Sequence, residues 1–197
     1  MGLLSRLFGS KQSAAGGKTA RATTADDPFR IERPTIGFLN LRGSAGEPQM
    51  QADQQVLRPL FTEVRVSTKE VPQCALLFLY CELDQRGRLV GHDASLRDII
   101  RDAHAYVAVV ATENPPNNYL SSLGPRQADW SANIVLTIDR KGDKFAPFFA
   151  ALFRRMFAGT SMLTAWAELA PQIPGHDHPD APGTMMVAEA GHVVLGR

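Results

Sequence analysis

The sequence predicts an α/β protein with a single, mostly parallel sheet that is flanked by helices on both faces. Three observations lead to this prediction. The segments 73–83 and 105–112 are continuously apolar, which is typical of strands buried on both faces. Segments with helical periodicity alternate with the strands, as they do around a parallel sheet. Apolar residues make up 44% of the 197 residues and charged residues 21%, which is enough for a sizeable core.

The expected elements begin with a short apolar strand at 35–41, which a loop with two glycines closes. A helix follows at 48–63, because its apolar residues lie on one stripe and Pro48 suits a first turn. Ser95 and Ser161 are expected to cap two helices, and Gly159 to end the helix between them. The remaining expected elements are strands at 63–67, 73–83, 105–112 and 133–139, helices at 96–103, 144–157 and 162–170, and a C-terminal strand or hairpin at 183–195.

The chain is expected to divide into a flexible basic tail, residues 1–30, and one α/β domain, residues 31–197. Residues 9–29 are small, polar and glycine-rich, as flexible linkers are. Within the tail, residues 3–8 would form one apolar face of a short helix and make contact with a membrane or a partner. Two turns are too short to hold a helix alone, so this anchor is the minor alternative.

Charge and cysteine content exclude several classes of function. Residues 1–25 contain four basic and no acidic residues, so the remaining chain has 17 basic against 20 acidic residues, a net charge of −3. A domain with this net negative charge lacks the basic surface typical of proteins that bind nucleic acid. Cys74 and Cys81 are too far apart in one strand to bridge each other. Two thiols without a disulfide framework favour the cytoplasm, and no apolar run reaches the length of a membrane-spanning helix.

Four segments of the sequence, taken in order, resemble the elements of a known fold. They are ALLFLYCELDQRGRLVGHDASLRDI (75–99), AYVAVVATEN (105–114), the strand and helix pair at 133–166, and PGTMMVAEAGHVVL (182–195). In this order they resemble the caspase-like fold, the fold of C14-type peptidases, and more loosely the bacterial CHAT domains of that clan. In that family one strand ends in His-Gly and leads through a glycine-bearing turn into a short helix, and the next strand ends in Ala-Cys, the nucleophile. The resemblance covers roughly residues 35–195.

The two most specific positions of that family differ in this chain. Tyr80-Cys81-Glu82 stands where the resemblance expects histidine, and Thr112 stands where it expects cysteine. A His–Cys dyad works because the imidazole removes the thiol proton and the thiolate attacks a carbonyl. A threonine hydroxyl does not ionise unaided. The resemblance therefore implies the scaffold and argues against the peptidase chemistry.

Several residues remain as candidates for chemistry or binding. Cys81 would be a nucleophile if His92 or His104 activated it, or else a small buried hydrophobe. His176 and His178 could contribute to a metal site if a third ligand joined them. The loop 42–47 joins a strand to a helix, where amides can bind phosphate, but it is no Walker A motif. The segment after the strand 105–112 is expected to bind a polar ligand or a peptide backbone through Glu113, Asn114, Asn117, Asn118 and Tyr119.

Three functional hypotheses follow. The first is a non-catalytic caspase-like domain that binds another protein, a peptide or a ligand and needs no cofactor. The second is a hydrolase with a displaced nucleophile, Cys81 or Thr112. The third is a nucleotide-binding regulatory domain that uses the loop 42–47. The missing dyad ranks the first hypothesis above the second.

Overall fold

A computed structural model describes residues 29–112, 114, 118, 132–137, 144–170, 184–187 and 193–197, with residues 133–137 and 184–187 described by their backbone alone. Its main element is a six-stranded sheet of order β3-β2-β4-β5-β6-β7. All neighbouring strands are parallel except β7, which runs antiparallel to β6. The strands are β2 (Thr35–Asn40), β3 (Glu63–Ser67), β4 (Leu76–Tyr80), β5 (Val107–Ala111), β6 (Asn133–Thr137) and β7 (Thr184–Val187).

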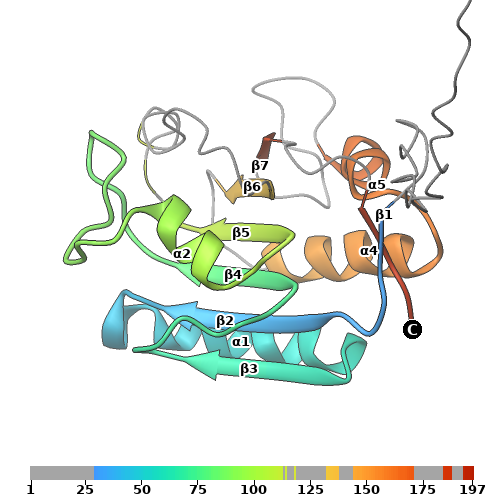
Figure 1. The fold of residues 1–197 in the computed structure, drawn as a ribbon, viewed down its shortest axis with the longest axis horizontal. Helices are drawn as coiled ribbons and strands as arrows, with labels where there is room; N and C mark the ends of the chain where they lie inside the picture. Colours follow the sequence, from blue (N-terminus) through green and yellow to red (C-terminus); the bar gives the residue numbers. More distant parts are fainter. Residues whose placement is uncertain are drawn as a thin grey trace, which may run out of the picture.

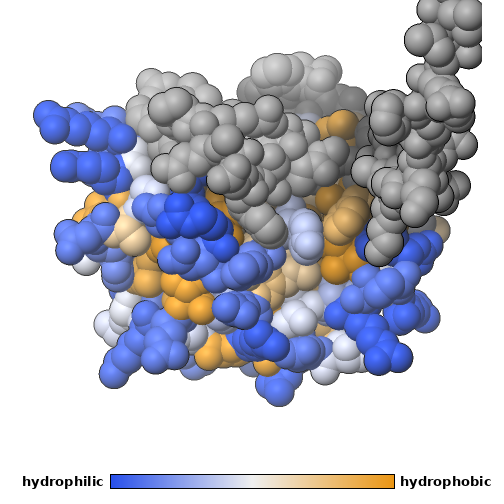
Figure 2. All heavy atoms as spheres, in the orientation of Figure 1, coloured by the Kyte–Doolittle hydropathy of each residue, from blue (hydrophilic) through white to orange (hydrophobic). Residues whose placement is uncertain are grey.

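Helices cover both faces of this sheet, which confirms the predicted α/β class (Figure 1). They are α1 (Glu47–Leu57), α2 (Leu96–Asp102), α4 (Phe145–Phe157) and α5 (Met162–Leu169). One apolar cluster joins α1, α4 and α5 to one side of the strands, and a second joins α2 to the other side. In the view of Figure 2 hydrophilic residues cover much of the surface, with smaller hydrophobic areas between them.

The helix ends follow the expected capping chemistry. The Ser95 side chain accepts a hydrogen bond from the Asp98 backbone N–H, and Asp98 completes a capping box. Ser161 caps α5 in the same way, through the Thr164 N–H. Gly159 follows the end of α4 with a φ of +95°, a conformation that glycine adopts without strain.

The first helix is shorter than the sequence predicts. α1 ends at Leu57, and a short 3-10 helix, η2 (Arg58–Leu60), follows. Pro59 has no N–H to donate to the preceding turn, so the hydrogen-bond ladder of an α-helix is interrupted there. Phe61 is already extended, which turns the chain toward β3.

Residues 184–187 and 193–195 form strands, as expected for the C-terminal segment, but the two strands do not pair with each other as the hairpin alternative required. β7 pairs with β6 in the main sheet, whereas β8 (Val193–Leu195) pairs in parallel with β1 (Phe29–Ile31) in a separate two-stranded sheet. Val193 and Leu195 are buried in the cluster that contains α4 and α5. The first described strand, β1, begins at Phe29, two residues before the expected start of the domain.

Candidate functional site

The carboxyl ends of β2, β4 and β5 meet at one edge of the sheet, at the left of Figure 1. The last residue of β4, Tyr80, is in register with Asn40 on β2 and with Ala111 on β5. Cys81 and Thr112 therefore follow neighbouring, parallel strand ends. This carboxyl edge is where ligands bind in open α/β sheets, so it is the first place to look for a functional site.

Cys81 is a buried thiol rather than an available nucleophile. Its side chain is 1% exposed and belongs to the apolar cluster beneath α2. Burial raises the pKa of the Cys81 thiol to about 12, because desolvation outweighs the opposing effect of the Arg42 guanidinium, and Glu82 raises it further. The thiol is therefore protonated at neutral pH, and this protonated form is a poor nucleophile.

Thr112 is buried and its hydroxyl is already engaged. The Oγ1 donates a hydrogen bond of 2.6 Å to Oδ1 of Asn114, and accepts one of 3.2 Å from the Asn114 backbone N–H. This is a local turn motif of threonine and asparagine. Among the described residues, no imidazole is hydrogen bonded to the hydroxyl, so none of them is placed to remove its proton.

Asn114 and Asn118 both hold the backbone of Leu83, just beyond the end of β4. The Leu83 N–H donates to Oδ1 of Asn114 at 2.7 Å, and Nδ2 of Asn118 donates to the Leu83 carbonyl at 2.8 Å. The two amides satisfy backbone groups as a neighbouring strand would. The structure thus brings together two of the predicted binding residues. Their side-chain amides hold the backbone of a neighbouring segment in place.

Replacing Asn114 with alanine is expected to lower the free energy of unfolding by about 1–3 kcal/mol, because the Leu83 N–H loses its acceptor. Asn114→Asp keeps an oxygen at the same place and should cost less. Urea denaturation of both variants measures the difference. A loss below about 0.5 kcal/mol for Asn114→Ala, typical of plain surface sites, would instead leave the amide free for a binding role.

His92 lies on the loop 84–95, close to the end of β2 and exposed to solvent. Its Nε2 is 3.3 Å from the Leu41 carbonyl oxygen, and it has no hydrogen bond with Cys81 or Thr112 in the described part of the chain. Asp84 braces the start of the loop by accepting hydrogen bonds from the N–H groups of Arg86 and Arg88. The bond from Arg88 contributes most to a lowered pKa of Asp84.

The loop 42–47 is organised by Asn40, the buried last residue of β2. Oδ1 of Asn40 accepts from the Arg42 N–H at 2.9 Å, and its Nδ2 donates to the Gly43 carbonyl at 2.7 Å. The Gly46 N–H bonds the Gly43 carbonyl within the short 3-10 helix η1 (Gly43–Ala45). Two of the amides that a phosphate would need are thus used inside the loop. A Cβ atom at Gly46 would clash with Oδ1 of Asn40, which accounts for this glycine.

The sequence predicted Arg42 only as part of the loop 42–47 and missed its role between two strand ends. Its Nη1 donates to Oε1 of Gln49 at 2.8 Å, and its Nε lies 3.4 Å from Oε1 of Glu82. The guanidinium therefore links the end of β2 to the end of β4. A single basic residue after a strand gives no sequence signal for this role.

A buried polar pair beneath the edge was also missed. The Tyr80 hydroxyl donates a hydrogen bond of 2.7 Å to Oδ2 of Asp53, and both residues are buried. The sequence carries a signal for it, since Asp53 lies on the same helical face as Met50 and Leu57, which are buried too. A carboxylate on the apolar stripe of a helix indicates a buried partner.

Several predicted site residues lie outside the described residues: Glu113, Asn117, Tyr119, His176 and His178. Within the described ranges, no group of three or more His, Cys, Asp or Glu side chains could hold a metal ion. Among the helices described here, none has the length and apolar character needed to cross a membrane.

No protein-family model matches this chain, and no curated protein matches it at a significant level.

Proposed function

We propose that the chain is a non-catalytic, caspase-like domain that serves as a protein-interaction or ligand-binding module. One observation carries the proposal. The residues at the two strand ends where the resemblance expects the dyad, Cys81 and Thr112, follow adjacent parallel strands, but neither is poised for nucleophilic attack.

The adjacency of β4 and β5 supports the scaffold part of the proposal. A His–Cys dyad needs its two members on neighbouring strand ends, because an imidazole must reach the thiol within hydrogen-bond distance. Tyr80 and Ala111 are register partners, so the residues that follow them begin from equivalent positions. This arrangement is the one the resemblance predicts, with a different pair of residues in it.

The burial of Cys81 and the hydrogen bonding of Thr112 support the absence of catalytic activity in the proposal. Cys81 has a pKa of about 12 because of its burial, and it has no imidazole as a hydrogen-bond partner among the described residues. Thr112 donates its proton to the Asn114 side chain instead of to a base. A hydrolase with either residue as a displaced nucleophile would need an activating base that the described residues do not supply.

The carboxyl edge supports a binding role through its exposed polar groups. Glu82 is about half exposed beside Arg42, with its side chain at 51% of full exposure. His92 is exposed on the adjoining loop. Such groups fit a polar peptide or protein partner at the edge where α/β sheets place their sites.

We place the domain in the cytoplasm, because two free, buried thiols suit a reducing compartment.

The native protein is expected to resist a thiol-reactive probe such as iodoacetamide at pH 8, whereas the urea-unfolded chain should label at both cysteines. The physical reason is that Cys81 and Cys74 are both buried and both have a pKa raised to about 12 by desolvation. Mass spectrometry of the intact protein counts the labels.

Cys81→Ala and Cys74→Ala are the matched controls for this experiment. Stoichiometric labelling of the native protein that disappears in Cys81→Ala and persists in Cys74→Ala would contradict the proposal, because it would identify a reactive thiol at the carboxyl edge. Equal, slow labelling of both single variants would agree with two buried, unreactive thiols.

A further inference from the structure

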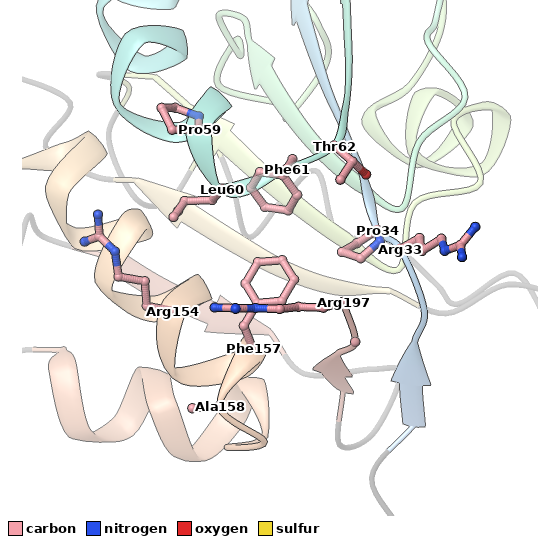
Figure 3. Close-up of a pocket in the computed structure, with 11 residues that line it drawn as sticks. Arg33, Pro34, Pro59, Leu60, Phe61, Thr62, Arg154, Phe157, Ala158 and Arg197 are labelled. Atoms are coloured by element: carbon pink, nitrogen blue, oxygen red, sulfur yellow. The ribbon is translucent and has the colours of Figure 1, made fainter.

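A pocket of about 660 Å³ lies at the other edge of the sheet, where β2 and β3 begin (Figure 3). Four segments that are distant in the sequence line it. They are residues 33–34 before β2, residues 59–62 before β3, the end of α4, and residues 196–197 after β8. The volume is in the range of pockets that bind small molecules. The pocket does not share residues with the carboxyl edge, so it is independent of the function proposed there.

One part of the pocket wall is apolar and aromatic. Phe61 and Phe157 have ring centroids 5.6 Å apart, and Leu60 lies beside them. Phe61 packs edge-on against Phe153 in the core, which fixes its position. Phe157 and Leu60 are only partly buried, so they present apolar surface to the pocket. A ligand with an apolar body would remove this surface from water.

The described residues that line the pocket include three arginines and no acidic residue. The guanidinium groups of Arg33, Arg154 and Arg197 form no ion pair or hydrogen bond within the part of the chain that the structure describes. In Figure 3 Arg197 runs beside the Phe157 ring, on the side of the pocket that carries Arg154, whereas Arg33 lies at the far end and points away. Arg197 is therefore the cation that lies along the aromatic wall, and Arg154 is the second arginine on the same side of the pocket.

Glu32 and Glu63, which adjoin lining residues along the chain, already have cationic partners. Glu32 packs against Gly196, where a Cβ atom would clash with it, and its Oε1 is 3.8 Å from Nε of Arg30. Glu63, at the start of β3, forms an ion pair with Arg65. No acidic side chain among the described residues forms an ion pair with the guanidinium groups of the pocket.

We propose that this pocket binds a small organic carboxylate, with its head at Arg154 and Arg197 and its apolar body against Phe61 and Phe157. Guanidinium groups bind carboxylates through paired, charge-assisted hydrogen bonds, which gives the head group its place. The basic tail is a poor occupant, because residues 1–25 carry four basic and no acidic residues and would be repelled. The volume of the pocket suits a small molecule better than a folded protein partner.

Octanoate is a suitable probe, with octanamide as its uncharged analogue, and isothermal titration calorimetry measures both against the full chain. Octanoate should bind saturably, and octanamide should bind at least on the order of tenfold more weakly, because it cannot form charge-assisted hydrogen bonds. Octyl phosphate provides a third arm. If it bound tenfold or more tightly than octanoate, the pocket would be a phosphate site and the carboxylate proposal would fail.

Arg154→Gln should weaken octanoate binding by on the order of tenfold, whereas Arg155→Gln should leave it unchanged. Arg155 is the matched control, because it is the next residue of the same helix, is also exposed, and pairs with Glu168 instead of lining the pocket. Thermal melting verifies that both variants fold. Equal binding of octanoate and octanamide, equal losses in the two variants, or no saturable binding of octanoate would each overturn the proposal.

Discussion

Phe78→Ala is expected to lower the free energy of unfolding by about 3–5 kcal/mol, the largest effect of any substitution considered for this protein. Phe78 is fully buried at the centre of β4. Its ring lies 5.3 Å from that of Phe149, and it also contacts Phe38, Phe145 and Phe153. Removing it leaves a cavity between the sheet and α4, which this ring-on-ring packing cannot easily fill.

The matched control is Phe29→Ala, which removes the same group from a site that is 48% exposed and has one ring neighbour, Tyr106, among the described residues. Urea denaturation compares the two variants, and Phe78→Leu serves if Phe78→Ala does not fold. Phe78→Leu should then lose less stability, since it fills part of the cavity. Similar losses for Phe78→Ala and Phe29→Ala would show that the packing around β4 is not the main source of stability.

Gly37→Ala is expected to destabilise the protein by about 1–3 kcal/mol, as overpacking a buried site does. Gly37 is a buried residue of β2, paired with β3 on one side and with β4 on the other. A Cβ atom there would clash with Sγ of Cys74 and would lie 3.2 Å from Cγ of Pro72. The backbone on both sides is held in the sheet, so β2 cannot move away.

A double-mutant cycle identifies the cause of this effect. Cys74→Ala removes the Sγ atom, so the double variant Gly37→Ala/Cys74→Ala should lose less stability than the sum of the two single variants. The expected coupling is about 0.5–3 kcal/mol, the range for residues in contact. Strict additivity would mean that Gly37 is required for another reason, such as its contact with Pro72.

Much of the architecture could be predicted from local patterns. The continuous apolar runs locate β4 and β5, because a strand buried on both faces has no polar side to show. Ser95, Ser161 and Gly159 locate three helix ends, because capping is a contact between residues close in sequence. Each of these signals depends on neighbours along the chain.

The candidate site was less accessible to sequence reasoning. Asn114 and Asn118 are typical of a polar binding loop, yet their amides hold the Leu83 backbone, more than 30 residues away in the sequence. Gly46 resembles a phosphate-loop glycine, but the close approach of Asn40 is what requires it. In both cases the residue type is informative, whereas its partner depends on which strand ends lie side by side.

By itself, then, the sequence determined the α/β class, the apolar strands and the capped helices, because hydrophobic periodicity and capping act over a few residues. Only the tertiary structure decided that β8 joins β1 instead of β7, that Cys81 and Thr112 lie on neighbouring strand ends, and that the arginine-lined pocket forms. The pocket combines four segments that are distant from one another in the sequence. Sheet order and long-range packing bring such segments together, and no local pattern of residues encodes that order.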